Sequence, residues 1–135
     1  MTDRRQVNGS ITFFYYKDIE AAAKFYDAVM GFDIIDDQGW AKIFQINTSA
    51  YMGVVDGEKG FYRVQDKNAV LLTLVVNDVW EWYEYLKGFG VKLLTEVQEK
   101  EDIQVRCFFL EDPGGYALEI QQFLKPELAR TFKAR

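Results

Sequence analysis

The sequence contains no histidine and only one cysteine, and these shortages exclude several kinds of chemistry. Without histidine, the thiol of Cys107 cannot form a Cys–His nucleophile. A single cysteine also excludes an internal disulfide, which is typical of proteins kept in a reducing cytoplasm. We therefore expect a cytoplasmic protein in which Cys107 is a buried, unreactive thiol.

Basic tracts and long apolar runs are missing as well. The chain has a formal net charge of -5, whereas a nucleic-acid-binding surface is normally a basic stripe. No stretch approaches the roughly 20 apolar residues of a membrane helix. Residues 1–5 run into polar residues without the apolar segment of a signal peptide. We expect no nucleic-acid partner, no membrane association and no secretion signal.

The composition that remains is that of a folded domain. Hydrophobic residues make up 49% of the 135 residues and aromatic residues 16%, which argues against disorder. A chain of this length can bury roughly two thirds of its unfolded surface without a disulfide. Residues 1–135 are therefore expected to form a single domain.

One pattern occurs twice along the chain, and such an internal repeat is a strong indication of architecture. Each copy starts with a β-branched and aromatic run, at residues 10–16 and 70–76. Each run is followed by an aspartate that can cap a helix, Asp18 and Asp78. Further strands are expected at 32–35, 40–46 and 50–55 in the first copy and at 91–97, 103–110 and 116–123 in the second. Residues 126–133 should form a short helix opened by Pro126.

The repeat predicts an α+β fold of two βαβββ modules, at about 10–55 and 69–123. Neither module can bury its sheet alone. Side by side, they would form a curved, mostly antiparallel, eight-stranded sheet with a central cleft and helices on its convex side. The connecting segment, 56–68, is polar but contains Phe61 and Tyr62, an unusual pair for a solvated loop. We expect this loop to fold over another part of the protein.

The most specific motif is Glu-Asp-Pro-Gly-Gly-Tyr-Ala-Leu-Glu-Ile at residues 111–120. Together with Asp18, Phe25-Tyr26 and Gly31-Phe32 in the first half, and Asp78 and Gly90-Val91 in the second, it resembles the vicinal oxygen chelate superfamily. That superfamily includes glyoxalase I, extradiol dioxygenases, fosfomycin-modifying enzymes and bleomycin resistance proteins. The resemblance covers residues 10–123.

This resemblance implies where a metal would bind in the enzymes of the superfamily. Their four ligand positions fall here on Ile11, Gly53, Leu71 and Glu119, of which only Glu119 can bind a cation. A catalytic metal normally has about three protein ligands. We therefore expect no metal and no other cofactor, and the chain resembles the metal-free, bleomycin-resistance-like members. The loss of these ligands disfavours an enzyme, and no catalytic residue is assigned.

Side chains alternate across a strand, so the residues that share a face with these four positions should line the cleft. Trp40, at a strand start, could form a lid or stacking wall, or the edge of the core. The expected ligand-binding residues are Phe13, Tyr15, Trp40, Tyr51, Thr73, Glu119 and Gln121. Apolar walls with a few placed polar groups are typical of small-molecule sites.

The leading hypothesis is a metal-independent protein that binds, and sequesters, an aromatic or cationic small molecule, with Glu119 supplying charge. One alternative is a metal-independent lyase or isomerase with Glu119 as general base and Tyr15 or Tyr51 as acid. Another is an interaction module whose cleft is filled by Ile11 and Leu71. The resemblance also implies a homodimer.

Overall fold

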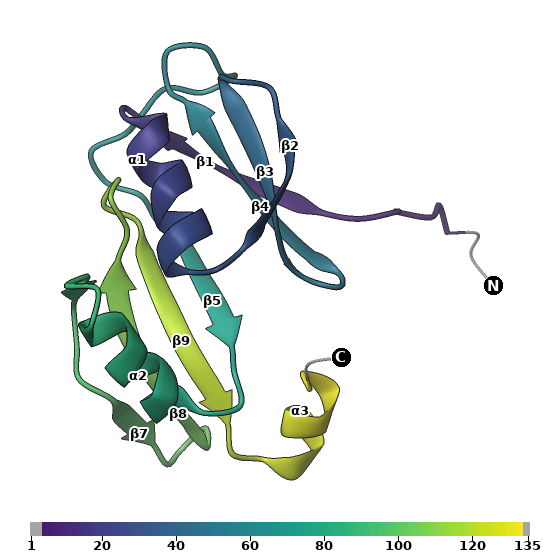
Figure 1. The fold of residues 1–135 in the computed structure, drawn as a ribbon. Helices are drawn as coiled ribbons and strands as arrows, with labels where there is room; N and C mark the ends of the chain where they lie inside the picture. Colours follow the sequence, from purple (N-terminus) through teal and green to yellow (C-terminus); the bar gives the residue numbers. More distant parts are fainter. Residues whose placement is uncertain (1–3, 134–135) are drawn as a thin grey trace. The chain divides into compact units, whose positions relative to one another are not determined.

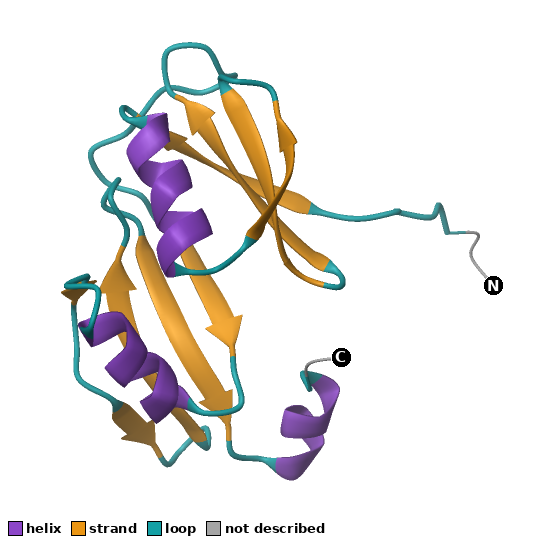
Figure 2. Ribbon diagram, in the orientation of Figure 1, coloured by secondary structure: helices purple, strands orange, loops and turns teal. Residues whose placement is uncertain are grey.

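The computed structural model describes residues 4–133, which form two compact units divided between Val64 and Gln65, unit 1 before this point and unit 2 after it. Each unit contains one sheet with helices packed on it (Figures 1 and 2). Across the described residues, no helix combines the length and the apolar character that a membrane crossing needs. The first three residues of the N-terminal segment considered for a signal peptide lie outside the described part.

Unit 1 has the element order that the repeat predicts, strand, helix and three strands. Its elements are β1 (Ile11–Tyr16), α1 (Ile19–Lys24), η1 (Phe25–Val29), β2 (Asp33–Asp37), β3 (Ala41–Asn47) and β4 (Ala50–Asp56). The sheet order is β1-β4-β3-β2, with β1 parallel to β4 and the other pairs antiparallel. The Asp18 side chain accepts a hydrogen bond of 3.0 Å from Ala21 N and so starts the helix as expected.

The helix of unit 1 ends in a wider turn that the sequence did not predict. Over η1 the backbone is π-helical, and Met30 N donates to the carbonyl of Phe25, five residues earlier, at 3.0 Å. Phe25 and Tyr26, the first two residues of this turn, are both buried. Gly31 then leaves the helix with a φ of +76°, a conformation that glycine adopts without steric cost.

Unit 2 repeats the order with shorter strands after its helix. Its elements are β5 (Leu71–Val75), α2 (Val79–Lys87), β6 (Lys92–Leu93), β7 (Gln98–Lys100), β8 (Val105–Glu111), β9 (Ala117–Phe123) and α3 (Pro126–Thr131). The sheet order is β5-β9-β8-β6, β7 also pairs with β8, and β5 is parallel to β9. The helix expected at 126–133 ends at Thr131.

The described strands correct the expected single sheet of eight strands. Their hydrogen bonds form a four-stranded and a five-stranded sheet. The segment expected as one strand at 91–97 forms only the two-residue β6, and the separate strand β7 follows. Pairing with β8 is interrupted there, because Leu94 N and Thr95 N both donate to the same carbonyl, that of Phe109. The curvature of the sheet and the central cleft stay predictions.

In each unit the helix covers one face of the sheet, and that face carries the core. In unit 1, α1 packs on β1 and β4, and Phe14 and Met52 are among the buried residues of these strands. In unit 2, α2 packs on β8 and β9. The ring of Tyr83 on α2 meets that of Phe108 on β8 edge to face, with 5.1 Å between centroids. The opposite face of each sheet, away from α1 or α2, carries every second residue of each strand. This face is called the open face.

Candidate functional site

Three of the expected ligand-binding residues meet on the open face of the sheet in unit 2. Thr73 on β5 lies opposite Glu119 on β9, and Gln121 follows two residues later on the same strand. Alternation along β9 places Leu118 and Ile120 on the other face, where both are fully buried. The strand register therefore separates the polar residues from the core under α2.

Glu119 is buried, with 8% of its surface exposed, and neutral side chains hold both of its oxygens. Thr73 Oγ1 donates to Oε1 at 2.8 Å. Gln121 Nε2 donates to Oε2 at 3.3 Å. Each donor partly replaces the water that a carboxylate loses on burial.

Cys107 is a third neighbour of Glu119, and sequence reasoning did not associate the two. It lies on β8 opposite Gln121 and is fully buried, as expected for an unreactive thiol. Burial raises the pKa of the Cys107 thiol, and the charge of Glu119, which also accepts a hydrogen bond from it, raises this pKa further. The antiparallel pairing of two strands flanking the Asp-Pro-Gly-Gly turn was the signal that could have revealed this contact.

No cation neutralises Glu119 within the described part of the chain. The ion pairs there are formed by other acids, namely Glu20, Asp37, Glu84, Glu99 and Glu111. The hydrogen-bond donors to Glu119 are thus neutral side chains.

The residues at this site do not fit the metal ion that the family resemblance implies. Of the two positions in unit 2 that correspond to metal ligands, Leu71 is apolar and Glu119 is already hydrogen-bonded on both oxygens. Among residues 4–133, no three histidine, cysteine, aspartate or glutamate side chains gather closely enough to hold an ion. One carboxylate and a protonated thiol do not make the set of about three ligands that a catalytic metal needs.

The open face of the sheet in unit 1 is aromatic. Phe13 on β1 lies opposite Gly53 on β4, and its ring occupies the place that a side chain at position 53 would take. Tyr51 and Tyr15 lie on the same face, one pair to either side. The position that the family resemblance assigns to a metal ligand is therefore filled here by the edge of a phenyl ring.

The segment after β4 folds over one end of this aromatic face, as its aromatic pair suggested. Gly60 approaches so closely that a Cβ there would lie 2.6 Å from Cε2 of Tyr15. The ring of Tyr62 meets that of Tyr15 edge to face, with 5.9 Å between centroids. Phe61 is 87% exposed, so the residues of this segment that pack against Tyr15 are Gly60 and Tyr62.

Trp40 has a different setting from the other expected residues of unit 1. It stands just before β3, is 41% exposed, and its carbonyl accepts a hydrogen bond of 2.8 Å from Asp56 N. This pairing continues the register of β3 and β4, so the side chains of Trp40 and Lys42 lie on the same face of the sheet. The Lys42 amine forms an ion pair with Glu20 of α1, which shows that this is the face covered by the helix. The structure therefore groups Thr73, Glu119 and Gln121 in unit 2, and Phe13, Tyr15 and Tyr51 in unit 1.

A comparison with protein families matches residues 10–120 to the model of the "Glyoxalase/Bleomycin resistance protein/Dioxygenase superfamily". The match spans the two modules and includes the Asp-Pro-Gly-Gly turn. A search of curated proteins finds no match.

Several solved structures share the fold. One is a glyoxalase/bleomycin resistance protein/dioxygenase from Nocardioides, with 17% identity, a TM-score of 0.74, and coverage of 93% of this chain and 88% of that one. TioX from Micromonospora sp. ML1 has 16% identity, a TM-score of 0.73, and coverage of 87% and 100%. The fosfomycin resistance protein FosX from Listeria monocytogenes has 16% identity, a TM-score of 0.73, and coverage of 91% and 98%. At these identities the likeness concerns the fold.

Proposed function

Because the chain belongs to the glyoxalase/bleomycin resistance protein/dioxygenase superfamily, we propose that it is a metal-independent protein that binds and sequesters a small cationic compound with aromatic or apolar groups. The observation that carries this proposal is Glu119, a buried carboxylate held by Thr73 and Gln121 with no cationic side chain beside it. The Glu119 carboxylate is positioned by these two hydrogen bonds and has no ion-pair partner, so a cationic group of a ligand would supply one.

The chemistry around Glu119 supports binding in the absence of a metal. The superfamily's metal enzymes use the ion as a Lewis acid and template, whereas here the matching positions carry Ile11, Gly53 and Leu71. Sequestration needs no bond to be made or broken. It requires an acceptor for the ligand's charge and apolar surface, and Glu119 supports the first of these in unit 2.

A thermal-shift screen of cationic and neutral aromatic compounds, followed by calorimetric titration of each hit, tests the proposal. Glu119→Gln should weaken binding of a cationic hit by about tenfold or more, because a buried charge pair loses one partner. Glu101→Gln removes the same charge from an exposed turn and serves as the matched control. Equal affinities in the two variants, or a panel with no hit, would refute the proposal.

Two further measurements separate the rival functions. Turnover of a hit that Glu119→Gln abolishes would identify a metal-independent lyase or isomerase. Elemental analysis of protein purified without chelator should find no stoichiometric transition metal, and zinc, iron, nickel or manganese at full occupancy would contradict metal independence.

The proposal includes a homodimer, for which sedimentation equilibrium should give twice the 15.7 kDa chain mass.

A further inference from the structure

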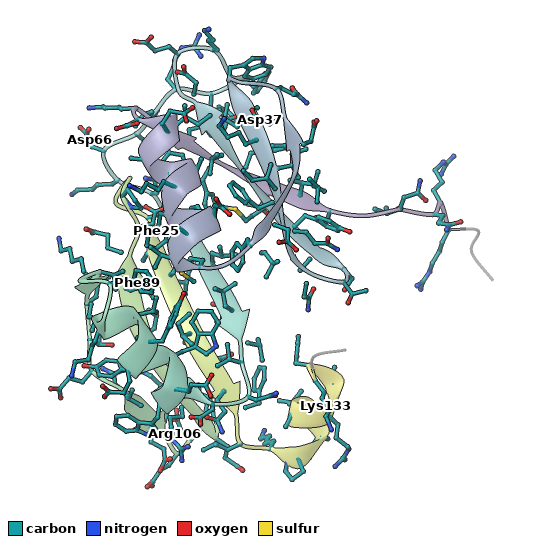
Figure 3. All side chains as sticks on the ribbon, in the orientation of Figure 1. Phe25, Asp37, Asp66, Phe89, Arg106 and Lys133 are labelled. Carbon is teal, nitrogen blue, oxygen red and sulfur yellow. The ribbon has the colours of Figure 1, made fainter. Side chains whose placement is uncertain are left out.

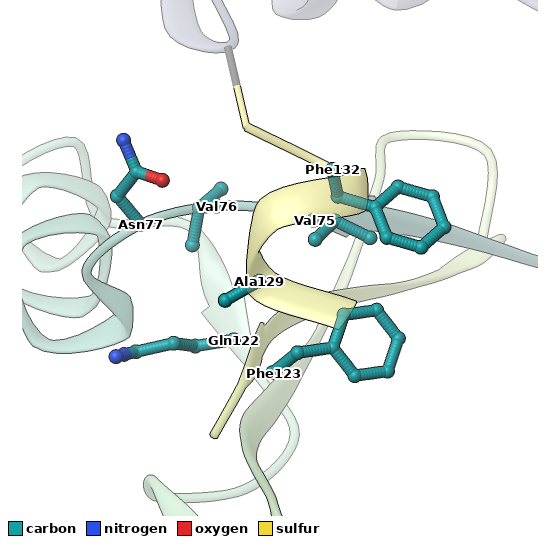
Figure 4. A pocket seen from close by; sticks show the side chains of 7 residues that line it. All are labelled: Val75, Val76, Asn77, Gln122, Phe123, Ala129 and Phe132. Carbon is teal, nitrogen blue, oxygen red and sulfur yellow. The ribbon is translucent and has the colours of Figure 1, made fainter. Parts of the chain in front are cut away.

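Unit 2 contains a small hollow at the end of the open sheet face, beside the C-terminal helix (Figure 4). Its volume is about 100 Å³. The lining residues are Val75, Val76, Asn77, Gln122, Phe123, Ala129 and Phe132. Five of the seven are apolar, so the hollow suits an alkyl or aryl group rather than an ion.

The wall that α3 contributes is held in place by aromatic stacking. The ring of Phe132, directly after α3, stacks on that of Phe123 on β9, with 5.3 Å between centroids and 24° between planes. Phe132 N donates to the carbonyl of Leu128 at 3.1 Å, which fixes its backbone to the helix. Yet Phe132 remains 50% exposed, so much of its ring stays available to a ligand.

This hollow is continuous in sequence and register with the Glu119 site. Phe123 lies four residues after Glu119 on β9 and shares its face by alternation, so their Cα atoms are about 13 Å apart. Gln121 lies between them and pairs with Val75, another residue of the hollow. The face of β9 that carries Glu119 and Gln121 thus leads to Phe123 at the hollow, which Gln122 of the opposite face also lines.

We propose that the hollow beside α3 receives the apolar tail of the ligand whose cationic group pairs with Glu119. The ligand class is then an elongated amphipathic cation, with its charge and its apolar end separated by about the length of four strand residues, roughly 13 Å. Transfer of an apolar group from water into these apolar surroundings is favourable. This inference rests on the function proposed above and assigns α3 a role in ligand selection.

Alkyltrimethylammonium ions with butyl, hexyl, octyl and decyl chains test the proposal, by calorimetric titration of the intact chain. Affinity should rise by about fourfold for each methylene group that enters apolar surroundings, and the rise should be steepest once the tail spans the distance to Phe123. Phe132→Ala should reduce the affinity for the octyl and decyl ions and leave that for the butyl ion unchanged. Ala129→Phe, which fills the hollow without removing a wall, should do the same.

Phe89→Ala is the matched control, because Phe89 is also 50% exposed and lies two residues after the end of α2 in the same unit (Figure 3). It should leave the whole series unchanged. If Phe132→Ala and Ala129→Phe bind the long ions as well as the wild-type chain does, the subsite is refuted. In that case a uniform loss of affinity in Glu119→Gln still supports the cation site. If Glu119→Gln binds every ion normally, or no ion binds, the proposed function fails and this inference fails with it.

Discussion

Thr73 and Glu119 face each other across the parallel pair of β5 and β9, and the threonine hydroxyl donates a hydrogen bond of 2.8 Å to the carboxylate. The two residues are 46 positions apart in the sequence. A buried carboxylate is stable only when donors or a cation replace its water. This contact therefore replaces part of the water that the Glu119 carboxylate loses on burial.

Removal of that donor should destabilise the protein. Thr73→Val keeps the side-chain shape and leaves Oε1 of Glu119 without its donor, which should lower the free energy of unfolding by about 1.5–3 kcal/mol. Urea denaturation followed by circular dichroism measures the change. Thr12→Val, at an exposed strand position, should shift it by less than about 0.5 kcal/mol, and an equal shift in both variants would contradict the interpretation.

The cost in stability of adding a side chain at Gly53 should depend on the ring of Phe13. A Cβ at position 53 would collide with that ring and lie 3.0 Å from the carbonyl oxygen of Lys42, so Gly53→Ala should cost about 1–3 kcal/mol of unfolding free energy. In a Phe13→Ala background the cost should be clearly smaller, and a double-mutant cycle gives the difference. Gly9→Ala, where a Cβ meets nothing within 4 Å, is the control. Additive costs would show that Phe13 does not occupy this space.

The ion pair of Lys42 with Asp37 predicts a pH-dependent stability difference between the wild-type chain and Lys42→Met. The amine lies 3.0 Å from the carboxylate. The hydrogen bond to Asp37 raises the pKa of Lys42 above its ordinary 10.5, so the stability it contributes is complete below pH 10.5 and is lost as the pH rises through the raised value.

At acidic pH, the stability that Asp37 contributes changes with pH in the opposite direction. The hydrogen bond from Gly39 N, and then Lys42, lower the pKa of Asp37 below its ordinary 3.8. Its contribution is therefore present above pH 3.8 and is lost as the pH falls through the lowered value. Unfolding free energies across pH should show a wild-type advantage that shrinks at both ends. Lys87→Met, at a 51% exposed side chain, should show no such profile, and a pH-independent difference would refute the ion-pair origin.

Cys107 should be inert in the folded protein. Only thiolate reacts rapidly with iodoacetamide, and burial beside Glu119 both hides the thiol and raises its pKa. Alkylation at neutral pH, followed by mass spectrometry, should be slower than in urea by about three orders of magnitude, because reaction requires the unfolded fraction. Cys107→Ala confirms that the adduct is specific. Comparable rates in the two conditions would show that the thiol is accessible.

Local signals predicted most of the fold. The caps at Asp18 and Asp78, where Asp78 Oδ1 accepts from Trp80 N at 3.0 Å, lie where the repeat placed them. The Asp112 turn closes as expected, with Gly115 at a φ of +89°. These features depend on residues within a few positions of one another, and so short-range sequence patterns are sufficient to predict them.

Other features required contacts between distant segments. The π-helical turn at Phe25–Val29 follows an apolar spacing that is typical of an ordinary helix, so the spacing alone does not reveal it. The short β6 reflects pairing with β8, whose carbonyl at Phe109 accepts from both Leu94 and Thr95.

The sequence by itself determined the family pattern, the two-module order and the identity of the one carboxylate at the metal-ligand positions, because each follows from residue type and spacing. The tertiary structure determined which side chains surround the Glu119 carboxylate. The pairing of β5, β8 and β9 brings Thr73 and Cys107 to Glu119, and no ion pair to Glu119 forms within the described chain. Hydrogen bonds and burial depend on which strands become neighbours, and that neighbourhood forms only when the whole sheet assembles.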